Sequence, residues 1–382
     1  MMVKRFLILL AAVFLFCSLP LPVFSEEEEA LSIACREDFS KVTANPSGNF
    51  ILTADIDMSG DPWEPIPFSG NLDGAGYRLF NLSFISPGKD SAVAYDSEYA
   101  EYDTLAGGLF SVLDGAEIRD LHLLNAEFHV SSDQNCFCGA IAGYAKDSIF
   151  DGCTVQTRGE LVASSQNAGI GGLVGFSQDS KFYGCDVNAE LVFKDTDEEV
   201  YCRQFLGGVY AFGCGLIEDC KVYNRGYAEV YGTVHAGGAV GMHRPYDRMM
   251  FSSMIQRTTV DFVLSFFQSP DTGRAYTAAL IGRDPEVLCR TRSNHTNNYR
   301  AYESKVPGRI NPETCEEPIY ESVDTPPTCT EWGYTTHTCL TCGYSYQSDY
   351  KTPQHMFEVI RLSAPTCTAG GRSSSVCVVC GT

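Results

Sequence analysis

A glycine-rich unit of four residues recurs along the middle of the chain. In each copy a pair that ends in glycine precedes two small, apolar or aromatic residues. The second residues of the pairs stand at positions 108, 139, 172, 208 and 238, so the spacings are 31, 33, 36 and 30 residues. Self-similarity at such a period is typical of a solenoid, in which each unit packs only on its neighbours. The repeat therefore predicts a stack of similar units.

A second pattern runs in phase with the first. It consists of an apolar residue, two others, an apolar residue or cysteine, one other, and a further apolar residue. Its middle members, at intervals of 39, 32, 32 and 35 residues, are Leu82, Leu121, Cys153, Cys185 and Cys220. We predict that these five side chains stack as one internal ladder. The three cysteines fit metal binding, disulfide formation or simple packing, and we favour a reduced apolar stack, because unpaired cysteine is among the most buried residue types.

Helical repeats have similar periods, so the local pattern must decide between helices and strands. The last two apolar positions of each unit are two residues apart, as in Cys185 and Val187, which places both side chains on one face of a strand. The units are also rich in Gly, Tyr, Val and Phe, which favour turns and strands. We therefore predict an all-β fold, a right-handed parallel β-helix whose coils stack at about 4.8 Å. The glycine pairs are expected where the chain turns tightly or approaches the next coil.

The stretch before the first glycine pair resembles the opening of bacterial surface proteins that carry GLUG repeats. The residues that carry this resemblance are Phe50, Asp55, Asp57, Gly60, Trp63, Pro65, Gly70, Asp73, Gly74, Gly76, Asn81 and Leu82, and the run Gly172, Leu173, Val174, Gly175 is similar to the repeat core. The resemblance covers about residues 35 to 265. It implies a β-helix and a surface location, and the same repeats occur beside the peptidase of IgA-cleaving metalloproteases. It implies no particular ligand.

The N-terminus is typical of a secretory signal peptide. Lys4 and Arg5 precede an apolar stretch, 6–16, which is too short to span a bilayer, and Ser25 precedes the predicted cleavage site. Phe39 and Val42 stand three apart, which predicts a short helix that caps the first coil. We divide the chain into a signal peptide (1–25), an N-terminal cap (26–49), a GLUG-type β-helix (50–305), a linker (306–325), a first Cys-rich repeat (326–363) and a second, incomplete one (364–382).

The Cys-rich repeats resemble small tandem repeats near the ends of Gram-positive surface proteins. The cysteines and flanking residues of 327–343 recur 38 residues later, in 365–381, with C-x9-C-x2-C spacing. Three cysteines and one histidine can close a tetrahedral Zn²⁺ site, whereas an exported chain also permits disulfides, and the sequence leaves both open. The candidate metal ligands are Cys329, Cys339, Cys342 and His355, with His337 as a substitute for His355, and Cys367, Cys377 and Cys380 in the second copy.

The composition and the absence of motifs narrow the function. The chain has 48 acidic and 27 basic residues, a net charge of -21, which argues against nucleic-acid binding because phosphate recognition needs a basic surface. No zinc-protease, serine-hydrolase, P-loop or deaminase motif is present. Asp55, Asp57 and Asp73 could serve a polysaccharide-cleaving site, as carboxylates do on other β-helices, although turn chemistry explains them more simply.

We therefore expect a non-enzymatic protein that is secreted or displayed at the cell surface, monomeric and without a membrane span. Its β-helix would be a stalk or binding platform for a host or cell-surface glycan or protein. Candidate contacts are the tyrosines of the insertion 87–103, namely Tyr95, Tyr99 and Tyr102. The alternatives are a polysaccharide lyase or hydrolase on the same fold, and the non-catalytic region of a larger surface enzyme such as an IgA-type metallopeptidase.

Overall fold

A computed structural model describes most of the chain beyond the predicted signal peptide. The described residues are 30–88, 93–94, 103–165, 167–195, 202–244, 253–269, 273–284, 289–304, 320–329, 333–339, 345–351, 357–363 and 372–377. The signal peptide lies outside them and stays a prediction. Among the helices of the described part, none is long and apolar enough to cross a membrane.

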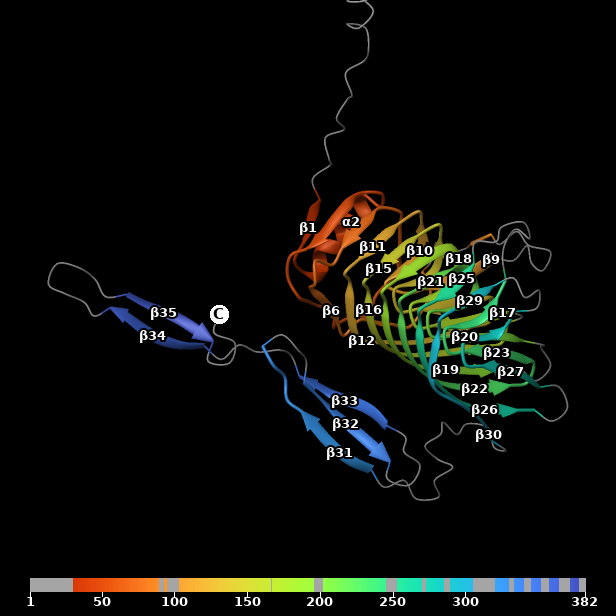
Figure 1. Cartoon of the computed structure of the whole chain (residues 1–382). Coiled ribbons are helices and arrows are strands. Elements are labelled where there is room, and N and C mark those ends of the chain that lie inside the picture. The colour runs from red at the N-terminus through yellow and green to blue at the C-terminus, as the bar shows by residue number, and fades with distance from the viewer. Residues whose placement is uncertain are drawn as a thin grey trace, which may run out of the picture.

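The chain from Leu31 to Ser304 winds into a parallel β-helix, as the repeats predict (Figure 1). Each coil contributes strands to three sheets, which we call the first, second and third. Along the chain, a coil passes through the third sheet, then the first, then the second. The first sheet contains β1 (Leu31–Ile33), β2 (Asn49–Leu52), β4 (Ile66–Phe68), β5 (Asn71–Asp73), β10 (Phe110–Asp114), β11 (Glu117–Arg119), β14 (Ala142–Lys146), β15 (Ile149–Asp151), β18 (Val174–Tyr183), β21 (Tyr210–Glu218), β24 (Val240–His243), β25 (Met254–Gln256), β28 (Ile281–Arg283) and β29 (Arg290–Arg292).

The other two sheets complete each coil. The second sheet contains β3 (Ile56–Asp57), β6 (Arg78–Phe80), β7 (Ser83–Phe84), β12 (His122–Ser132), β16 (Thr154–Ala163), β19 (Asp186–Asp195), β22 (Lys221–Val230), β26 (Thr259–Gln268) and β30 (His295–Ser304). The third contains β8 (Val93–Ala94), β9 (Asp103–Gly107), β13 (Cys136–Gly139), β17 (Asn167–Gly171), β20 (Arg203–Gly207), β23 (Thr233–Gly237) and β27 (Arg274–Ala278).

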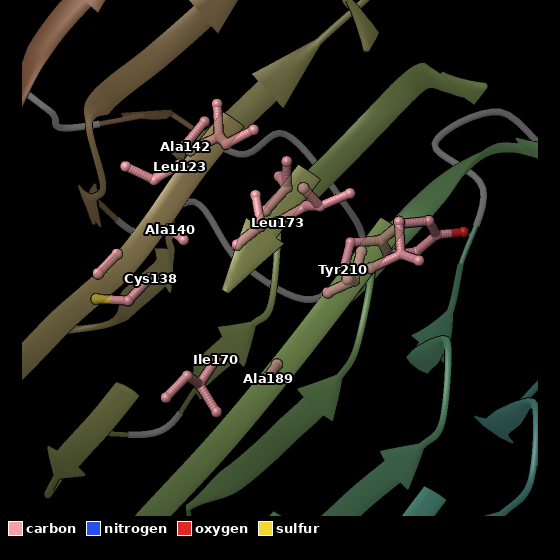
Figure 2. Packing of buried hydrophobic residues seen from close by; sticks show 14 of the residues in the cluster. Leu123, Cys138, Ala140, Ala142, Ile170, Leu173, Ala189 and Tyr210 are labelled. Carbon is pink, nitrogen blue, oxygen red and sulfur yellow. The ribbon is translucent and has the colours of Figure 1, made fainter. Parts of the chain in front are cut away.

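Because neighbouring coils pair in register, repeated residues become columns of touching side chains inside the solenoid. Phe150 pairs with Phe182 in the next coil, and their rings stack with centroids 4.8 Å apart. Figure 2 shows side chains from several coils, among them Ile170, Leu173 and Tyr210, in the same buried cluster. In strands such as β16 side chains alternate between buried and more exposed positions, as a strand with one face on a core requires. The main core is therefore a continuous stack, and a second, smaller buried cluster contains Phe137, Phe176, Phe205 and Phe212.

The glycine pairs stand at the corner between the third and first sheets, where successive coils come closest. The Gly208 N–H donates to the Gly238 oxygen at 3.0 Å, and a Cβ on Gly208 would lie 2.3 Å from that oxygen. A Cβ on Gly172 would lie 2.1 Å from the Gly208 oxygen. This confirms that the glycine pairs mark a close approach between coils.

The predicted cysteine ladder exists, with one correction. Successive backbone hydrogen bonds place Leu121, Cys153, Cys185 and Cys220 one above another, and all four are buried. Leu82 is buried but lies outside this column, because its carbonyl pairs with the Glu127 N–H. The register explains this difference. Leu72 pairs with Ile118 and Leu79 pairs with Leu123, yet six residues lie between the first members of these pairs and only four lie between the second.

Beyond Cys220 the ladder continues with polar residues. Met254 lies on β25, paired with Leu216 and Arg290, whereas Thr258 and Asn294 extend the ladder beyond Cys220. The ladder side chains donate to backbone carbonyls at this corner: the Cys185 Sγ lies 3.4 Å from the Tyr183 oxygen and the Thr258 Oγ1 lies 3.1 Å from the Gln256 oxygen. A thiol and a hydroxyl therefore perform the same task in different coils.

The predicted N-terminal cap is present. A 3-10 turn η1 (Arg36–Asp38) leads into α2 (Phe39–Ala44), whose buried residues are Phe39 and Val42. The Phe39 ring meets Trp63 edge-on, with centroids 5.3 Å apart. The strand β1 precedes this helix and extends the first sheet by pairing with β2. The helix thus closes the apolar end of the stack.

The Cys-rich region forms antiparallel strands. A three-stranded sheet contains β31 (Tyr320–Thr325), β32 (Gly333–Cys339) and β33 (Ser345–Lys351), and a hairpin contains β34 (Phe357–Ser363) and β35 (Arg372–Cys377). Strand β31 lies in the segment that the composition assigns to the linker. Strands β31 and β32 are related to β34 and β35 by the 38-residue repeat, so the structural unit begins with a strand ahead of the Pro-Thr-Cys motif.

Candidate functional site

Most of the site residues predicted from the sequence lie outside the described residues. This holds for Tyr95, Tyr99, Tyr102, Cys342, His355, Cys367 and Cys380. His337, on β32, is hydrogen-bonded through Nδ1 to the Ser322 Oγ at 2.7 Å. The backbone of Cys339 pairs with Tyr320, and the structure brings Cys329 and Cys377 together, with their Sγ atoms 3.4 Å apart. Among the described residues no three histidine, cysteine or carboxylate side chains gather as a metal site.

The carboxylates considered for polysaccharide cleavage serve turns and strand ends. Asp55 accepts from the Arg78 N–H at 2.9 Å, and Asp73 accepts from the Ala75 N–H at 2.7 Å. Asp57 accepts from the Ser59 N–H and from the Asn81 side chain, at 3.0 and 3.1 Å. Partial burial raises the pKa of Asp57, but these hydrogen bonds outweigh it and hold the pKa below its usual value. Asp57 is therefore ionised at neutral pH and unsuited to act as a general acid.

The thiols of the ladder are equally poor candidates for chemistry. Hydrogen bonding to Cys153 and Cys220, together with burial, holds the pKa of Cys185 well above its usual value. The thiolate is the reactive form of cysteine. Cys185 is therefore structural, and Cys153 and Cys220 are buried beside it.

The buried His243 also has structural surroundings. His243 has a fully buried side chain and bonds through Nδ1 to the Asp284 Oδ1 at 3.2 Å, and burial nevertheless lowers its pKa. Asp284 in turn accepts from the Cys289 N–H at 2.9 Å. Burial raises the pKa of the Cys289 thiol to about 12, so this Cys–His–Asp set contains no thiolate nucleophile at neutral pH.

The charged groups on the outer face of the second sheet pair from coil to coil. Arg158 lies 4.0 Å from Glu127 in the preceding coil and 3.2 Å from Glu190 in the next. Arg225 contacts Asp261 at 2.8 Å in the same way. Exposed pairs of this kind stabilise a fold by only about 0–1 kcal/mol each. In these pairs the arginine lies on one coil and its carboxylate partner lies on an adjacent coil.

The last described coil, residues 273–304, has a different charge balance. It contains five arginines against three acidic residues, a charge of 5 - 3 = +2 in a chain of net charge -21. Arg274, Arg283 and Arg292 have no carboxylate within ion-pair distance among the residues that the structure describes. We call this segment the terminal coil; its strands β27 to β30 are paired with the preceding coil on one side.

Arg274, Tyr276 and Arg283 form one group, which we call the arginine–tyrosine patch. Arg274 and Tyr276 are two residues apart on β27 and share a face, and the Arg283 Cζ lies 4.6 Å from the Tyr276 ring centre. The Tyr276 ring also stacks on His235, with centroids 5.1 Å apart, and His235 stacks on Phe205 at 5.6 Å. Tyr276 is 37% exposed and lies on strand β27, so the patch is on the surface of the solenoid and includes strand residues.

Burial keeps His235, on which Tyr276 stacks, uncharged. His235 is 2% exposed, and burial, with the nearby Arg283 and Arg203, lowers its pKa to about 3. It is therefore neutral at physiological pH and stacks as an aromatic ring. Arg283 is thus held on a column of rings, and a stacked guanidinium keeps its in-plane N–H donors free for a planar anion.

Sequence reasoning missed the patch. Its members are spread over ten residues without a motif. The glycine pair of the earlier coils is replaced in this coil by Ala278 and Ala279. The available signal was the concentration of arginines after residue 273 in an acidic chain.

Comparison with known proteins gives little further guidance. No family model and no curated protein matches the chain. One of the solved structures that it resembles is titled IgA1 Protease, with a TM-score of 0.42 and 15% sequence identity. The match covers 74% of this chain and 21% of that one, so the chain spans about a fifth of the length of the protein it matches.

Proposed function

We propose that the protein is an exported, non-enzymatic surface protein of the GLUG-repeat type, whose β-helix is a binding platform for an acidic glycan. Export is supported by the signal-peptide pattern of the first 25 residues. The non-enzymatic role is supported by the structural use of the carboxylates, thiols and histidines considered above.

The observation that carries the proposal is the arginine–tyrosine patch. Along the body of the solenoid a cation such as Arg158 is neutralised by carboxylates of the adjacent coils. Arg274 and Arg283 lie on the terminal coil, where an adjacent coil is described on one side only. An external ligand with carboxylate or sulfate groups supplies the anionic partners that the carboxylates of a further coil would supply. The rigid support of Arg283 lowers the entropy lost on binding.

Glycan-array binding with the mature protein tests the proposal. We expect uronic-acid or sulfated glycans to bind and neutral glycans not to bind, with affinity falling as salt rises. Replacing both Arg274 and Arg283 with Gln should abolish the signal. Arg119→Gln is the matched control, because Arg119 is exposed on the flank and already lies 3.3 Å from Glu117.

The competing functions give different results in the same experiment. Equal binding by the double variant and the wild type would place the ligand elsewhere, for example on the insertion 87–103. Shortening of a polysaccharide by contaminant-free protein would instead establish a lyase or hydrolase.

A further inference from the structure

Two buried cysteines among the described residues of the Cys-rich region touch each other across the repeat boundary. The Sγ atoms of Cys329 and Cys377 are 3.4 Å apart, and the residues are 8% and 1% exposed. Cys329 lies between β31 and β32, and Cys377 is the last residue of β35. The pair is therefore formed by the first cysteine of one repeat and the second cysteine of the next.

This pairing differs from the site expected within one repeat. By the 38-residue spacing, Cys329 corresponds to Cys367 and Cys377 corresponds to Cys339. A site closed inside the first copy would place Cys329 beside Cys339 and Cys342. The contact with Cys377 instead links the strand pair β31–β32 to the hairpin β34–β35.

The surroundings show why a covalent link matters here. Of the apolar side chains described beyond residue 304, those of Cys329 and Cys377 are buried, whereas Val323 is 57% exposed. Antiparallel strands without an apolar face on a core are marginally stable in water. Small exported domains with such a composition are held by disulfides or metals.

We propose that Cys329 and Cys377 form a disulfide that joins the two Cys-rich repeats. The two thiols each lose a proton and together lose two electrons, and one S–S bond forms. The oxidant is a disulfide compound, whose own S–S bond is broken and which leaves as two thiols. The sulfurs must approach from 3.4 Å to about 2.05 Å. The reaction needs a disulfide donor and does not depend on the glycan-binding proposal.

Peptide mapping of the whole mature chain tests the pairing. The reduced protein is oxidised with oxidised glutathione, remaining thiols are alkylated, and the protein is digested with trypsin and a glutamate-specific protease. Peptide 322–331 contains Cys329 as its sole cysteine, 332–351 contains Cys339 and Cys342, and 373–382 contains Cys377 and Cys380. We expect 322–331 joined to 373–382, with the loss of two hydrogens.

Single variants distinguish the neighbouring cysteines. Cys377→Ser should remove the linked peptide and leave Cys329 alkylated, whereas Cys380→Ser and the control Cys339→Ser should retain the link. Metal content is measured on a sample prepared without oxidant. A link between peptides 322–331 and 332–351, full alkylation of Cys329 after oxidation, or one retained Zn²⁺ per chain that protects these thiols would each overturn the proposal.

Discussion

Gly208→Ala is the substitution that most directly tests the stacking of the coils. Gly208 stands at the corner between β20 and β21, and its φ is not in the left-handed region, so backbone conformation does not demand glycine there. A Cβ would instead lie 2.3 Å from the Gly238 oxygen and 2.3 Å from the Val222 Cγ1. Ordinary contacts of a Cβ begin at 3.4 Å, so two neighbours, one of them backbone, must move by about 1 Å.

The cost of this movement has two parts. Overpacking of a well-packed interior costs about 1–3 kcal/mol. The same shift strains the hydrogen bond from the Gly208 N–H to the Gly238 oxygen, and a buried donor left without its acceptor costs a further ~1–3 kcal/mol. We expect Gly208→Ala to lower the free energy of unfolding by about 4 kcal/mol. With an m-value of about 3 kcal/mol per molar urea, the midpoint should fall by about 1.3 M.

Gly184→Asn is the matched control, because the two glycines are retained for opposite reasons. Gly184 has φ +58° and nothing within 4 Å of its Cβ position. The same corner of other coils has Asp120 and Asp219 with φ 46° and 58°, and Asn adopts this conformation readily. Urea unfolding followed by far-UV circular dichroism should therefore place Gly184→Asn within about 1 kcal/mol of wild type. Equal midpoints for the two variants would refute the close-approach argument.

Three further outcomes follow from buried groups. Leu121→Asp, which buries an unpaired charge in the ladder, should lower the free energy of unfolding by about 3–5 kcal/mol in the same urea assay, and a loss below 1 kcal/mol would contradict the interior placement. His235 has a pKa of about 3 in the folded state and about 6.5 in the unfolded state, so below pH 6.5 the unfolded chain binds a proton that the folded chain does not, and the folded state loses stability. Urea titrations should therefore show that His235→Phe recovers about 2 kcal/mol at pH 5. At pH 8 there is no such pH-dependent loss to recover. Iodoacetamide at pH 8 should label the exposed Cys35 and leave Cys153, Cys185 and Cys220 unlabelled until urea is added, and labelling of the ladder in the folded protein would show that it is accessible.

The β-helix could be predicted because in-register stacking converts a sequence period into a spatial column. Phe150 and Phe182, 32 residues apart, are neighbours for this reason. The same logic failed for Leu82, where the first coil has two additional residues before Leu79 and the spacing no longer reports the register. It also failed for Thr258, because an apolar pattern cannot detect a hydroxyl that replaces a thiol in bonding the same kind of carbonyl.

The proposed binding surface could not be predicted from the repeats. Repeats reveal the residues that each coil shares with its neighbours. The arginine–tyrosine patch consists of residues that the terminal coil does not share with the other coils. Tyr276 occupies the column position of His235 and Phe205, yet it is partly exposed, and the Arg283 Cζ lies 4.6 Å from its ring centre. The functional hypothesis therefore required the pairing of strands, in addition to the composition.

The two ends of the solenoid follow different rules, and one interior column shows how. From the N-terminal coils onward this column contains Phe68, Leu113, Ala145, Ser177, Gly213 and His243, all buried. The apolar end requires the helix α2 as a cover, since exposed aromatic rings would otherwise meet water. The other end becomes polar: His243 bonds Asp284, Asn294 donates to the Ile255 oxygen, and Tyr299 lies over Phe262 at 6.0 Å. A stack whose interior grows polar has less apolar surface to cover at this end, which fits the proposal that Arg274 and Arg283 bind an anionic ligand there.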